Sequence, residues 1–392
     1  MSRDPLLPGP GAGSTPATLG VMGGGQLGRM FVHAAQALGF HTAVLDPDRD
    51  SPAGRVSHHH VQTDYLDAQG LAQMAQLCGA ITTEFENVPA GAMRTLAAQR
   101  PVAPAAEALQ IAQDRIQEKA HFAACGVPCA PYAALAHESQ LAAVPDDLLP
   151  GILKTARLGY DGKGQVRVAD RAALAAAWSA LRGVPCVLEK LLPLQAECSA
   201  IVARGQDGAL VHFPVQRNVH RDGILATTTV HEGNLPAGVA AQALQAARAI
   251  AEGLHYVGVL CVEFFVVQGS ERLLVNEIAP RPHNSGHYTI DACDQSQFDL
   301  QVRTLAGLPL VPPRQHSPAI MLNLLGDLWA DAPPDWAAVL ALPGTHLHLY
   351  GKLAARPGRK MGHLTVTGAT VDQVRATAAQ AAALLGLPPA LD

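Results

Sequence analysis

The chain has 392 residues, of which 48% are apolar and only 16% are charged, and its formal net charge is −5. These values are typical of a globular protein with two or three domains and exclude a disordered chain. They give no general positive field for nucleic acid or an anionic membrane, and no apolar run reaches the about 18 residues of a membrane span. The seven cysteines form no CxxC pair, which predicts neither a disulfide framework nor a zinc ribbon and favours a cytoplasmic location. Residues 1–17 are rich in proline and glycine, lack the apolar core of a signal peptide, and are predicted to be a flexible leader.

Strands and helices alternate in the first hundred residues. The sequence predicts a strand over 18–22, a helix over 26–38, a strand over 41–45, a helix over 68–77 and a strand over 81–86. This alternation is typical of a parallel sheet flanked by helices.

The turn after the first strand carries Gly23, Gly25 and Gly28 in GxGxxG spacing, and Asp46 ends the second strand. This order matches the dinucleotide fingerprint, in which backbone amides approach a phosphate and an acid binds a ribose hydroxyl. The glycines could instead form only a tight turn, or bind one phosphate of a mononucleotide.

Glu84 and Glu86 lie on one side of the strand over 81–86, at its carboxyl end, where parallel sheets bind ligands. A solvated strand end is the alternative. The three histidines at 58–60 are consecutive, so their side chains diverge, and no second ligand cluster lies nearby in the sequence. We expect them on the surface.

A helix is predicted over 105–125, with Arg115 and Lys119 four residues apart on one face. A strand over 151–154 ends at Lys154 and leads into the glycine-rich loop 159–165, GYDGKGQ. Such a loop can offer backbone N–H groups to phosphates, with lysines as point charges, although it does not follow the Walker A order. A polar turn is the alternative, but it leaves Lys154 without a role.

The middle of the chain continues this mixed pattern. A helix is predicted over 171–181, a strand over 185–189, a strand over 210–215, a polar turn through 216–223, and an alanine-rich helix over 238–254. We expect the last helix to be scaffold.

Two apolar runs, 260–267 and 272–278, flank a turn and predict an antiparallel hairpin. If the numbers of paired residues sum to 540, Glu263 lies opposite Glu277, with Cβ atoms about 4.5–5.5 Å apart. A register that differs by one residue places Asn276 there instead. Facing carboxylates repel, so a divalent cation such as Mg²⁺ with a bound nucleotide is the economical interpretation, and two solvated acids are the alternative.

The segment after the hairpin is punctuated by proline and glycine and concentrates polar groups. It carries Arg281, His283, Asn284 and His287. Polar residues gathered on a loop after a strand indicate a site.

The proline-rich stretch 309–318 marks a boundary. Strands over 320–325, 346–350 and 364–367 are predicted beyond it. The connection between the last two carries a basic patch, namely Lys352, Arg356, Arg359 and Lys360. A solvated loop is the usual explanation of such a patch, and a phosphate anchor is the alternative.

Four motifs taken together resemble the N5-carboxyaminoimidazole ribonucleotide synthases of purine biosynthesis, a family of ATP-grasp enzymes. They are GGGQLGRM at 23–30, GYDGKGQ at 159–165, Glu263 with NEIAPRPHNSGH at 276–287, and RPGRKMGH at 356–363. The resemblance runs from about residue 18 almost to the carboxyl end.

The fold class implied by this resemblance is mixed α/β and α+β, an ATP-grasp fold. The implied domains are an N-terminal Rossmann-like (pre-ATP-grasp) domain over 18–104, an ATP-grasp domain over 105–315 and a small β-rich C-terminal domain over 316–392. The resemblance also implies a homodimer.

The family reaction, as the resemblance implies it, joins aminoimidazole ribonucleotide to bicarbonate, with ATP as co-substrate and Mg²⁺ or Mn²⁺ as the metal. Attack of bicarbonate on the γ-phosphate would give carboxyphosphate, with Lys154 and Arg281 helping the metal to neutralise charge. The ribonucleotide amine would then form the carbamate, and Asp161 is the candidate to orient or deprotonate it. Closure of the glycine loop would keep water away from the intermediate.

Site residues follow from the matched motifs. The implied ATP-binding residues are Arg115, Lys154, Gly159, Tyr160, Asp161, Gly162, Lys163, Gly164, Gln165, Glu189, Lys190, Leu191, Leu192, Glu197, His220, Asn276 and Glu277, with the 189–192 backbone at the adenine and Glu197 at the ribose. The implied metal ligands are Glu263 and Glu277. The implied ribonucleotide-binding residues are Gln26, Tyr160, Asp161, Lys352, Arg359 and Lys360. The implied catalytic residues are Asp161, Arg281, His283 and Asn284, of which the last three lie where bicarbonate and the phosphoryl group would meet.

Three other functions remain open from the sequence. The first is a different ATP-grasp ligase, such as a formate-using glycinamide ribonucleotide transformylase or a biotin carboxylase. The second is a dinucleotide-dependent oxidoreductase, which would leave the paired glutamates without a role. The third is a non-catalytic nucleotide sensor, which ATPase activity would exclude.

Overall fold

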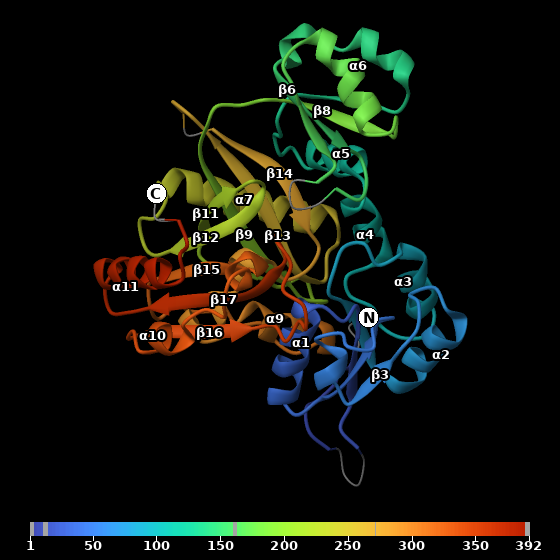
Figure 1. The fold of residues 1–392 in the computed structure, drawn as a ribbon. Coiled ribbons are helices and arrows are strands. Elements are labelled where there is room, and N and C mark those ends of the chain that lie inside the picture. Colours follow the sequence, from blue (N-terminus) through green and yellow to red (C-terminus); the bar gives the residue numbers. More distant parts are fainter. Residues whose placement is uncertain (1–3, 11–14, 160–162, 271, 389–392) are drawn as a thin grey trace.

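The computed structural model describes residues 4–10, 15–159, 163–270 and 272–388. The strands of this part of the chain form three sheets, with the orders β3-β2-β1-β4, β5-β8-β6-β7 and β14-β13-β9-β11-β12-β15-β17-β16. In Figure 1 the small sheet with β6 and β8 stands at the top, the N-terminal elements lie at the bottom, and the large sheet lies between them.

The N-terminal sheet is parallel, as the alternation of strands and helices predicts. Its elements are β1 (Thr18–Met22), α1 (Gln26–Ala37), β2 (His41–Leu45), the short helix η1 (Gly54–Val56), β3 (His59–Val61), α2 (Ala68–Leu77), β4 (Ala80–Thr83) and α3 (Ala90–Ala97). The expected strand over 81–86 therefore ends at Thr83, and Glu84 and Glu86 lie in the loop beyond it. His58 and His59 are exposed, as expected, whereas His60 is half-buried, with Nε2 3.1 Å from the Asp46 carbonyl oxygen.

The helix predicted over 105–125 is two helices, α4 (Ala106–Ala112) and α5 (Arg115–Ala124). The break has a local cause, because the Asp114 side chain accepts hydrogen bonds from the backbone N–H groups of Ile116 and Gln117. A side chain in this N-cap position begins a new helix. Arg115 and Lys119 lie together on α5.

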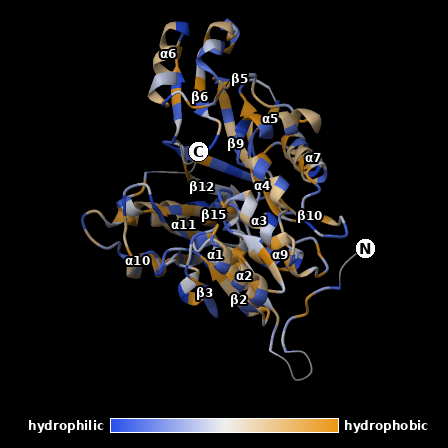
Figure 2. Ribbon diagram, turned by 90° about the vertical axis from the view of Figure 1, so that its right-hand side faces the viewer, coloured by the Kyte–Doolittle hydropathy of each residue, from blue (hydrophilic) through white to orange (hydrophobic). Residues whose placement is uncertain are grey.

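The small sheet is antiparallel and carries one helix on its face. Its strands are β5 (Tyr132–Leu135), β6 (Gly151–Thr155), β7 (Gln165–Val168) and β8 (Cys186–Lys190), and its helices are the short η2 (Glu138–Ala143) and η3 (Asp146–Leu148) and α6 (Arg171–Ala180). Leu174, Ala177 and Trp178 of α6 are buried against the strands. Figure 2 shows hydrophilic and hydrophobic residues mixed along such outer helices, including α2 and α6.

The large sheet begins with β9 (Leu194–Arg204), β10 (Leu210–His212), β11 (Gln216–Arg221) and β12 (Ile224–Val230), and continues after α7 (Ala237–Gly253) with β13 (Gly258–Val267) and β14 (Leu273–Ala279). Two expectations were wrong here. The predicted strand over 210–215 ends at His212, and the polar segment 216–221 is a strand instead of a turn. The strands β9 and β12 were not predicted. Only Asp222 and Gly223 form the turn, with φ angles of 50° and 78°.

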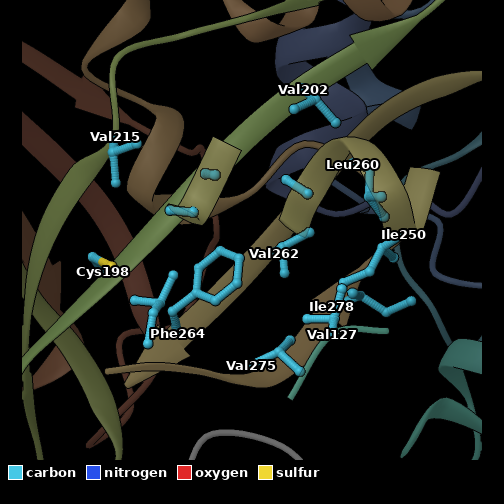
Figure 3. Close-up of a cluster of buried hydrophobic side chains, with 14 of the residues drawn as sticks. Val127, Cys198, Val202, Val215, Ile250, Leu260, Val262, Phe264, Val275 and Ile278 are labelled. Carbon is cyan, nitrogen blue, oxygen red and sulfur yellow. The ribbon is translucent and has the colours of Figure 1, made fainter. Parts of the chain in front are cut away.

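One face of the large sheet packs against α7. Leu260, Val262 and Phe264 alternate along β13 and are buried in the same core as Ile250 of α7 (Figure 3). Successive side chains of a strand point to opposite faces, so Glu263 projects from the other face of this sheet. The core therefore determines which face carries the polar residues.

The C-terminal strands extend the large sheet, because β15 (Ala319–Leu325) pairs with β12. The remaining elements are the short helix η4 (Asn284–Gly286), α8 (Thr289–Ala292), α9 (Gln297–Ala306), η5 (Gly326–Trp329), α10 (Trp336–Leu340), β16 (Thr345–Leu349), β17 (Lys360–Thr367) and α11 (Val371–Leu384). Phe298 and Val302 of α9 share a core with α1, which joins the large sheet to the N-terminal part. Among the described helices, none is long and apolar enough to cross a membrane.

Candidate active site

A row of polar side chains crosses the large sheet on the face opposite α7. Glu277 of β14 pairs with Glu263 of β13, Glu263 pairs with Ser199 of β9, and Ser199 pairs with Gln216 of β11. Directly paired residues of antiparallel strands share a face. The hairpin register in which paired numbers sum to 540 is therefore confirmed at Glu263.

The hairpin contains a β-bulge immediately beside this pair. Glu263 pairs with Glu277, but Phe264 pairs with Val275, so Asn276 is the extra residue of β14. A bulge inserts one residue into one strand and re-aims the side chains around it. Both registers considered for the hairpin are thus present, one on each side of Asn276. The bulge allows Phe264 and Val275 to remain in the core.

Arg115 of α5 holds one of the two facing carboxylates. Its Nη1 atom lies 2.8 Å from Oε2 of Glu277. Burial opposes the charged guanidinium, but the charge of Glu277 outweighs this effect and raises the pKa of Arg115. The facing glutamates are therefore not equivalent, because Glu277 forms an ion pair with a permanently charged guanidinium, whereas Glu263 lies against the imidazole of His283.

Glu263 is buried, and burial raises the pKa of its carboxyl group to about 7. The charge of His220 lowers this pKa, whereas the charges of Glu277 and Glu197 raise it. His283 lies against Glu263, with Nε2 3.4 Å from Oε1. Burial, followed by the charge of Arg281, keeps the pKa of His283 well below its usual value, so this ring is neutral.

Several buried polar atoms around this pair have no hydrogen-bond partner within the described chain. They are Glu263 Oε1, Asn276 Oδ1 and both side-chain amide atoms of Asn284. Buried polar groups are normally satisfied, so unpaired ones grouped beside two carboxylates indicate that another molecule completes the site. Carboxylate oxygens are ligands suited to Mg²⁺, and Glu263 and Glu277 fit such an ion.

A buried ion-pair cluster lies on the small-sheet side. Glu189 of β8 is 2.9 Å from Lys119 Nζ and 2.8 Å from Lys154 Nζ. Burial alone would raise the pKa of Glu189, but Lys154 and then Lys119 lower it to about 2. Two cations on one carboxylate leave an excess positive charge in the wall of the site, which suits a polyphosphate.

Glu197 and His220 form a second pair on the large sheet. The carboxylate of Glu197 on β9 contacts Nδ1 of His220 on β11. Burial lowers the pKa of His220, but the hydrogen bond to Glu197 outweighs this and the pKa is raised. The side chain of Glu197 remains 31% exposed, so one carboxylate oxygen can reach a ligand hydroxyl.

The glycine-rich loop between β6 and β7 is described only in part. Tyr160, Asp161 and Gly162 lie outside the described residues, so their predicted roles stay predictions. Gly164 adopts a φ angle of 73°, and its carbonyl accepts a hydrogen bond from the Thr155 N–H group. Lys163 is exposed, and Gln165 begins β7 opposite Lys154. A Cβ atom at Gly159 would lie 3.8 Å from the Arg115 guanidinium, so the loop approaches the residue that holds Glu277.

The segment after β8 borders the same wall. Lys190 and Leu191 donate backbone hydrogen bonds to the carbonyls of Pro131 and Pro150, and Leu192 follows them. The N–H groups of Lys190 and Leu191 are therefore occupied within the chain, and the adenine-binding role of the 189–192 backbone stays a prediction.

The GxGxxG turn holds a carboxylate of its own chain. Glu84 accepts hydrogen bonds from the N–H groups of Gly25 at 2.8 Å and Gly28 at 3.0 Å. Gly24 donates to Asp46 at 2.7 Å. The amides that would bind a dinucleotide phosphate are therefore occupied, and the structure favours the tight-turn interpretation over the NAD interpretation. Gln26 begins α1 at this turn.

Arg281 joins the N-terminal part to the large sheet. Its Nε atom contacts a carboxylate oxygen of Glu86, and Glu86 lies in the loop after β4. Burial would raise the pKa of Glu86, but Arg281 outweighs this and the pKa is lowered. Of the two glutamates expected to face a ligand here, Glu86 instead forms an ion pair with Arg281.

The basic patch of the C-terminal part lies close to the same residues. Lys352 Nζ donates to the Lys360 carbonyl at 2.6 Å, and Arg359 Nη1 donates to the Ala354 carbonyl at 2.8 Å. The charge of Lys360 contributes to the pKa shifts of Glu263 and His283. Lys360 therefore lies near the β13–β14 hairpin, whereas the Arg359 side chain forms a hydrogen bond within its own loop.

Sequence reasoning left several contributors to the site without a role. Lys119 completes the ion-pair cluster, and Ser199, Gln216 and Ser285 form a hydrogen-bonded network beneath the site. His283 Nδ1 lies 2.9 Å from the Ser285 hydroxyl at the edge of this network. The spacing of Arg115 and Lys119 on one helix face was a usable signal for Lys119, but the network depends on strand pairings that were not predicted.

Comparison with known families finds three successive matches along the chain. Residues 16–113 match the ribonucleotide synthetase preATP-grasp domain, residues 120–298 match the ATP-grasp domain, and residues 319–377 match the phosphoribosylaminoimidazole carboxylase C-terminal domain.

Curated relatives are similar over nearly their whole length. An N5-carboxyaminoimidazole ribonucleotide synthase of Brucella melitensis is 44% identical over 372 residues, which cover 93% of this chain and 98% of that protein. The enzyme of the same name from Bacillus subtilis is 38% identical, with 93% of each chain covered.

Solved structures agree with these matches. N5-carboxyaminoimidazole synthetase from Staphylococcus aureus complexed with ADP is 36% identical, with a TM-score of 0.88 over 98% of this chain and 100% of that chain. N5-carboxyaminoimidazole synthase from Aspergillus clavatus in complex with ADP and 5-aminoimidazole ribonucleotide is 32% identical, with a TM-score of 0.86 over 95% of this chain and 99% of that chain.

Proposed function

Because the chain belongs to the N5-carboxyaminoimidazole ribonucleotide synthase family of ATP-grasp ligases, we propose that the residues around Glu263 and Glu277 are its catalytic centre. The enzyme is an ATP-dependent ligase that carboxylates 5-aminoimidazole ribonucleotide to N5-carboxyaminoimidazole ribonucleotide in purine biosynthesis. The observation that carries the assignment of the site is the group of unsatisfied buried polar atoms at Glu263, Asn276 and Asn284.

ATP is the co-substrate, and we place it between the small and large sheets. Lys154 and Lys119, both fixed by Glu189, offer positive charge from one side. The Glu197–His220 pair offers a ribose acceptor from the other side. Mg²⁺ held by Glu263 and Glu277 would neutralise charge on the phosphoryl oxygens.

Bicarbonate is proposed as the carboxyl source, bound near Arg281, His283 and Asn284. Its oxygen would attack the γ-phosphate to form carboxyphosphate and ADP. Arg281 stays charged because Glu86 raises its pKa although burial opposes the charge, so it can stabilise the anionic intermediate. His283 is neutral and can only donate or accept a hydrogen bond, which suits orientation of bicarbonate better than charge stabilisation.

The ribonucleotide is proposed to bind between the N-terminal turn at Gln26 and the basic residues Lys352, Arg359 and Lys360. Its exocyclic amine would attack the carboxyl carbon and release phosphate. Asp161 remains the candidate for orienting or deprotonating this amine. The proposal is supported by the contact between these two parts of the chain, because Arg55 Nη1 donates to the carbonyl of Gly351, next to Lys352, at 3.4 Å.

Three further features of the family resemblance are kept as proposals. We propose a homodimer and the division into domains at residues 17, 104 and 315. We also propose a cytoplasmic location, which suits the seven cysteines that are free in the structure.

The test is ADP release by the purified protein with MgATP and bicarbonate, measured with and without 5-aminoimidazole ribonucleotide. Strong stimulation by this ribonucleotide is expected, with one phosphate released for each carbamate formed. Stimulation by glycinamide ribonucleotide with formate instead would assign the centre to the sister ligase. Absence of ATP turnover with either acceptor would overturn the catalytic proposal.

A further inference from the structure

A compact group of imidazole and carboxylate side chains lies apart from the proposed ATP and bicarbonate sites, between α8 and the β16–β17 hairpin. His348 of β16 pairs directly with His363 of β17, with ring centroids 4.5 Å apart and planes inclined by 13°. Asp291 of α8 reaches the same point, with Oδ2 2.9 Å from His348 Nε2. One potential ligand atom from each of the three residues lies within 4.8 Å of the other two.

His363 has one ring nitrogen in use and one without a partner. Its Nδ1 atom lies 3.0 Å from the Tyr350 hydroxyl, whereas its Nε2 atom is buried and finds no hydrogen bond in the part of the chain that the structure describes. Leaving a buried nitrogen unpaired is unfavourable. If the Nδ1 proton is donated to Tyr350, the Nε2 lone pair is free, which is how a second residue orients a metal-ligating histidine.

The His363 ring is in the chemical form that metals require. Burial lowers the pKa of His363 well below its usual value, and the charges of His287 and His348 act in the same direction. The ring is therefore neutral and retains a lone pair.

We propose that Asp291, His348 and His363 form a binding site for zinc or a similar first-row divalent cation. Two imidazole nitrogens and one carboxylate are ligands that zinc prefers, whereas magnesium takes oxygen ligands. Bonds of about 2.0–2.1 Å in a tetrahedral site place ligand atoms about 3.3 Å apart. Asp291 and His348 are already close to this spacing, whereas the ligand atoms of the group extend to within 4.8 Å, so the stacked His363 ring has to turn towards the ion. The His348 side chain is 29% exposed and gives the ion a path from solvent.

A cation bound at this site would link two elements that are distant in the sequence. It joins α8, which directly follows the 281–287 loop, to the hairpin whose connecting loop carries Lys352 and Arg359. Such a cation would hold the proposed ribonucleotide-binding loop against the proposed bicarbonate-binding loop. The ion site itself does not depend on the proposed reaction, and its occupancy can be measured without substrates.

The test uses the full-length protein stripped of metal by a chelator, dialysed and titrated with Co²⁺ and with Zn²⁺ in the absence of ATP and Mg²⁺. We expect about one equivalent of Zn²⁺ per chain and the intense visible bands of low-symmetry Co²⁺ with nitrogen ligands. The variants Asp291→Asn and His348→Gln should each lose these bands. Tyr350→Phe should keep them with affinity about tenfold weaker, because only the partner of a ligand is removed.

Two controls separate this site from other places where a divalent cation could bind. Glu263→Gln removes a proposed magnesium ligand, and His59→Gln interrupts the histidine run at 58–60 at an exposed position. Both should retain the Co²⁺ bands, and circular dichroism should show that all variants are folded. Absence of stoichiometric binding to the unmodified protein, or bands that disappear in either control and persist in Asp291→Asn, would overturn the proposal.

Discussion

Glu277 faces Glu263 across the β13–β14 hairpin and forms an ion pair with Arg115, whose Nη1 atom lies 2.8 Å from its Oε2 atom. The pair is therefore one neutralised carboxylate beside one buried carboxyl group with a raised pKa. This asymmetry makes the two residues separately testable.

Glu277→Gln should lower ribonucleotide-stimulated ADP release by about 100-fold or more, because it removes a proposed metal ligand at the transferred phosphoryl group. The matched control is Glu107→Gln, which removes an exposed ion pair with Arg94. The control should change the rate little. Equal activity of Glu277→Gln and the unmodified enzyme would remove Glu277 from the centre.

The magnesium requirement should depend on pH through Glu263. The carboxyl group must be ionised to hold a cation, and its pKa is raised to about 7, chiefly by burial. The Mg²⁺ concentration that gives half-maximal ADP release should therefore fall as the pH rises through about 7 and level off above it. In Glu263→Gln this concentration should be higher and should lose its dependence on pH near 7. A requirement that is flat with pH in the unmodified enzyme would contradict the role of Glu263.

Glu189 should stabilise the fold above its ordinary pKa and lose this effect in acid. Its pKa in the folded protein is about 2, below the usual 4.5, so its contribution is present above about pH 4.5 and disappears as the pH falls towards 2. The shift corresponds to about 3 kcal/mol in the free energy of unfolding. Urea unfolding at a series of pH values should show a smaller acid loss in Glu189→Gln than in the unmodified protein.

The same substitution should also destabilise the neutral protein by about 3–5 kcal/mol, because Lys119 and Lys154 would be left buried without their counter-charge. Glu138→Gln, at an exposed position, is the control and should leave both the neutral stability and its acid dependence unchanged. An acid profile that is the same for Glu189→Gln and for this control would show that the cluster does not couple protonation to folding.

Gly25→Ala should be destabilising and should impair activity. The added Cβ atom would collide with the carboxylate of Glu84, which accepts the Gly25 N–H group. A cost of about 1–3 kcal/mol is expected from such overpacking. Gly91→Ala is the control, because a Cβ atom there meets nothing within 4 Å and lies in helix α3.

Thermal or urea unfolding of the two glycine variants should separate them, with Gly91→Ala neutral or more stable by about 0.5–1 kcal/mol. If the unmodified protein bound NADH and Gly25→Ala did not, the dinucleotide interpretation of this turn would be restored.

The hairpin and its paired glutamates could be predicted because they depend on a local pattern. Alternation of apolar residues on both sides of a short turn defines the strands, and the register then brings Glu263 to Glu277. The bulge at Asn276 could not be predicted from the sequence. It arises because Phe264 and Val275 must both remain in the α7 core while the two glutamates stay on the opposite face.

The strands β9 and β11 were missed because their apolar pattern is interrupted by the polar residues that build the site. One face of these two strands carries the paired polar residues Glu197 and Ser199 on β9 and Asn218 and Gln216 on β11. A strand is recognised in a sequence by apolar residues on a buried face, and here that face is polar. The partner of Glu84 was hidden for a different reason. Its hydrogen bonds to Gly25 and Gly28 span more than fifty residues of chain and follow only from the packing of β4 beside β1.

The pairing of β12 with β15 has a practical consequence for fragments of this enzyme. Residues 227–230 of β12 use their outer edge to pair with residues 319–322 of β15. A fragment truncated before residue 319 would therefore present an unpaired edge of backbone donors and acceptors to other chains, and such edges promote aggregation. Fragments that lack the carboxyl-terminal strands should therefore be insoluble because of this unpaired edge, even when every residue of the proposed ATP site is intact.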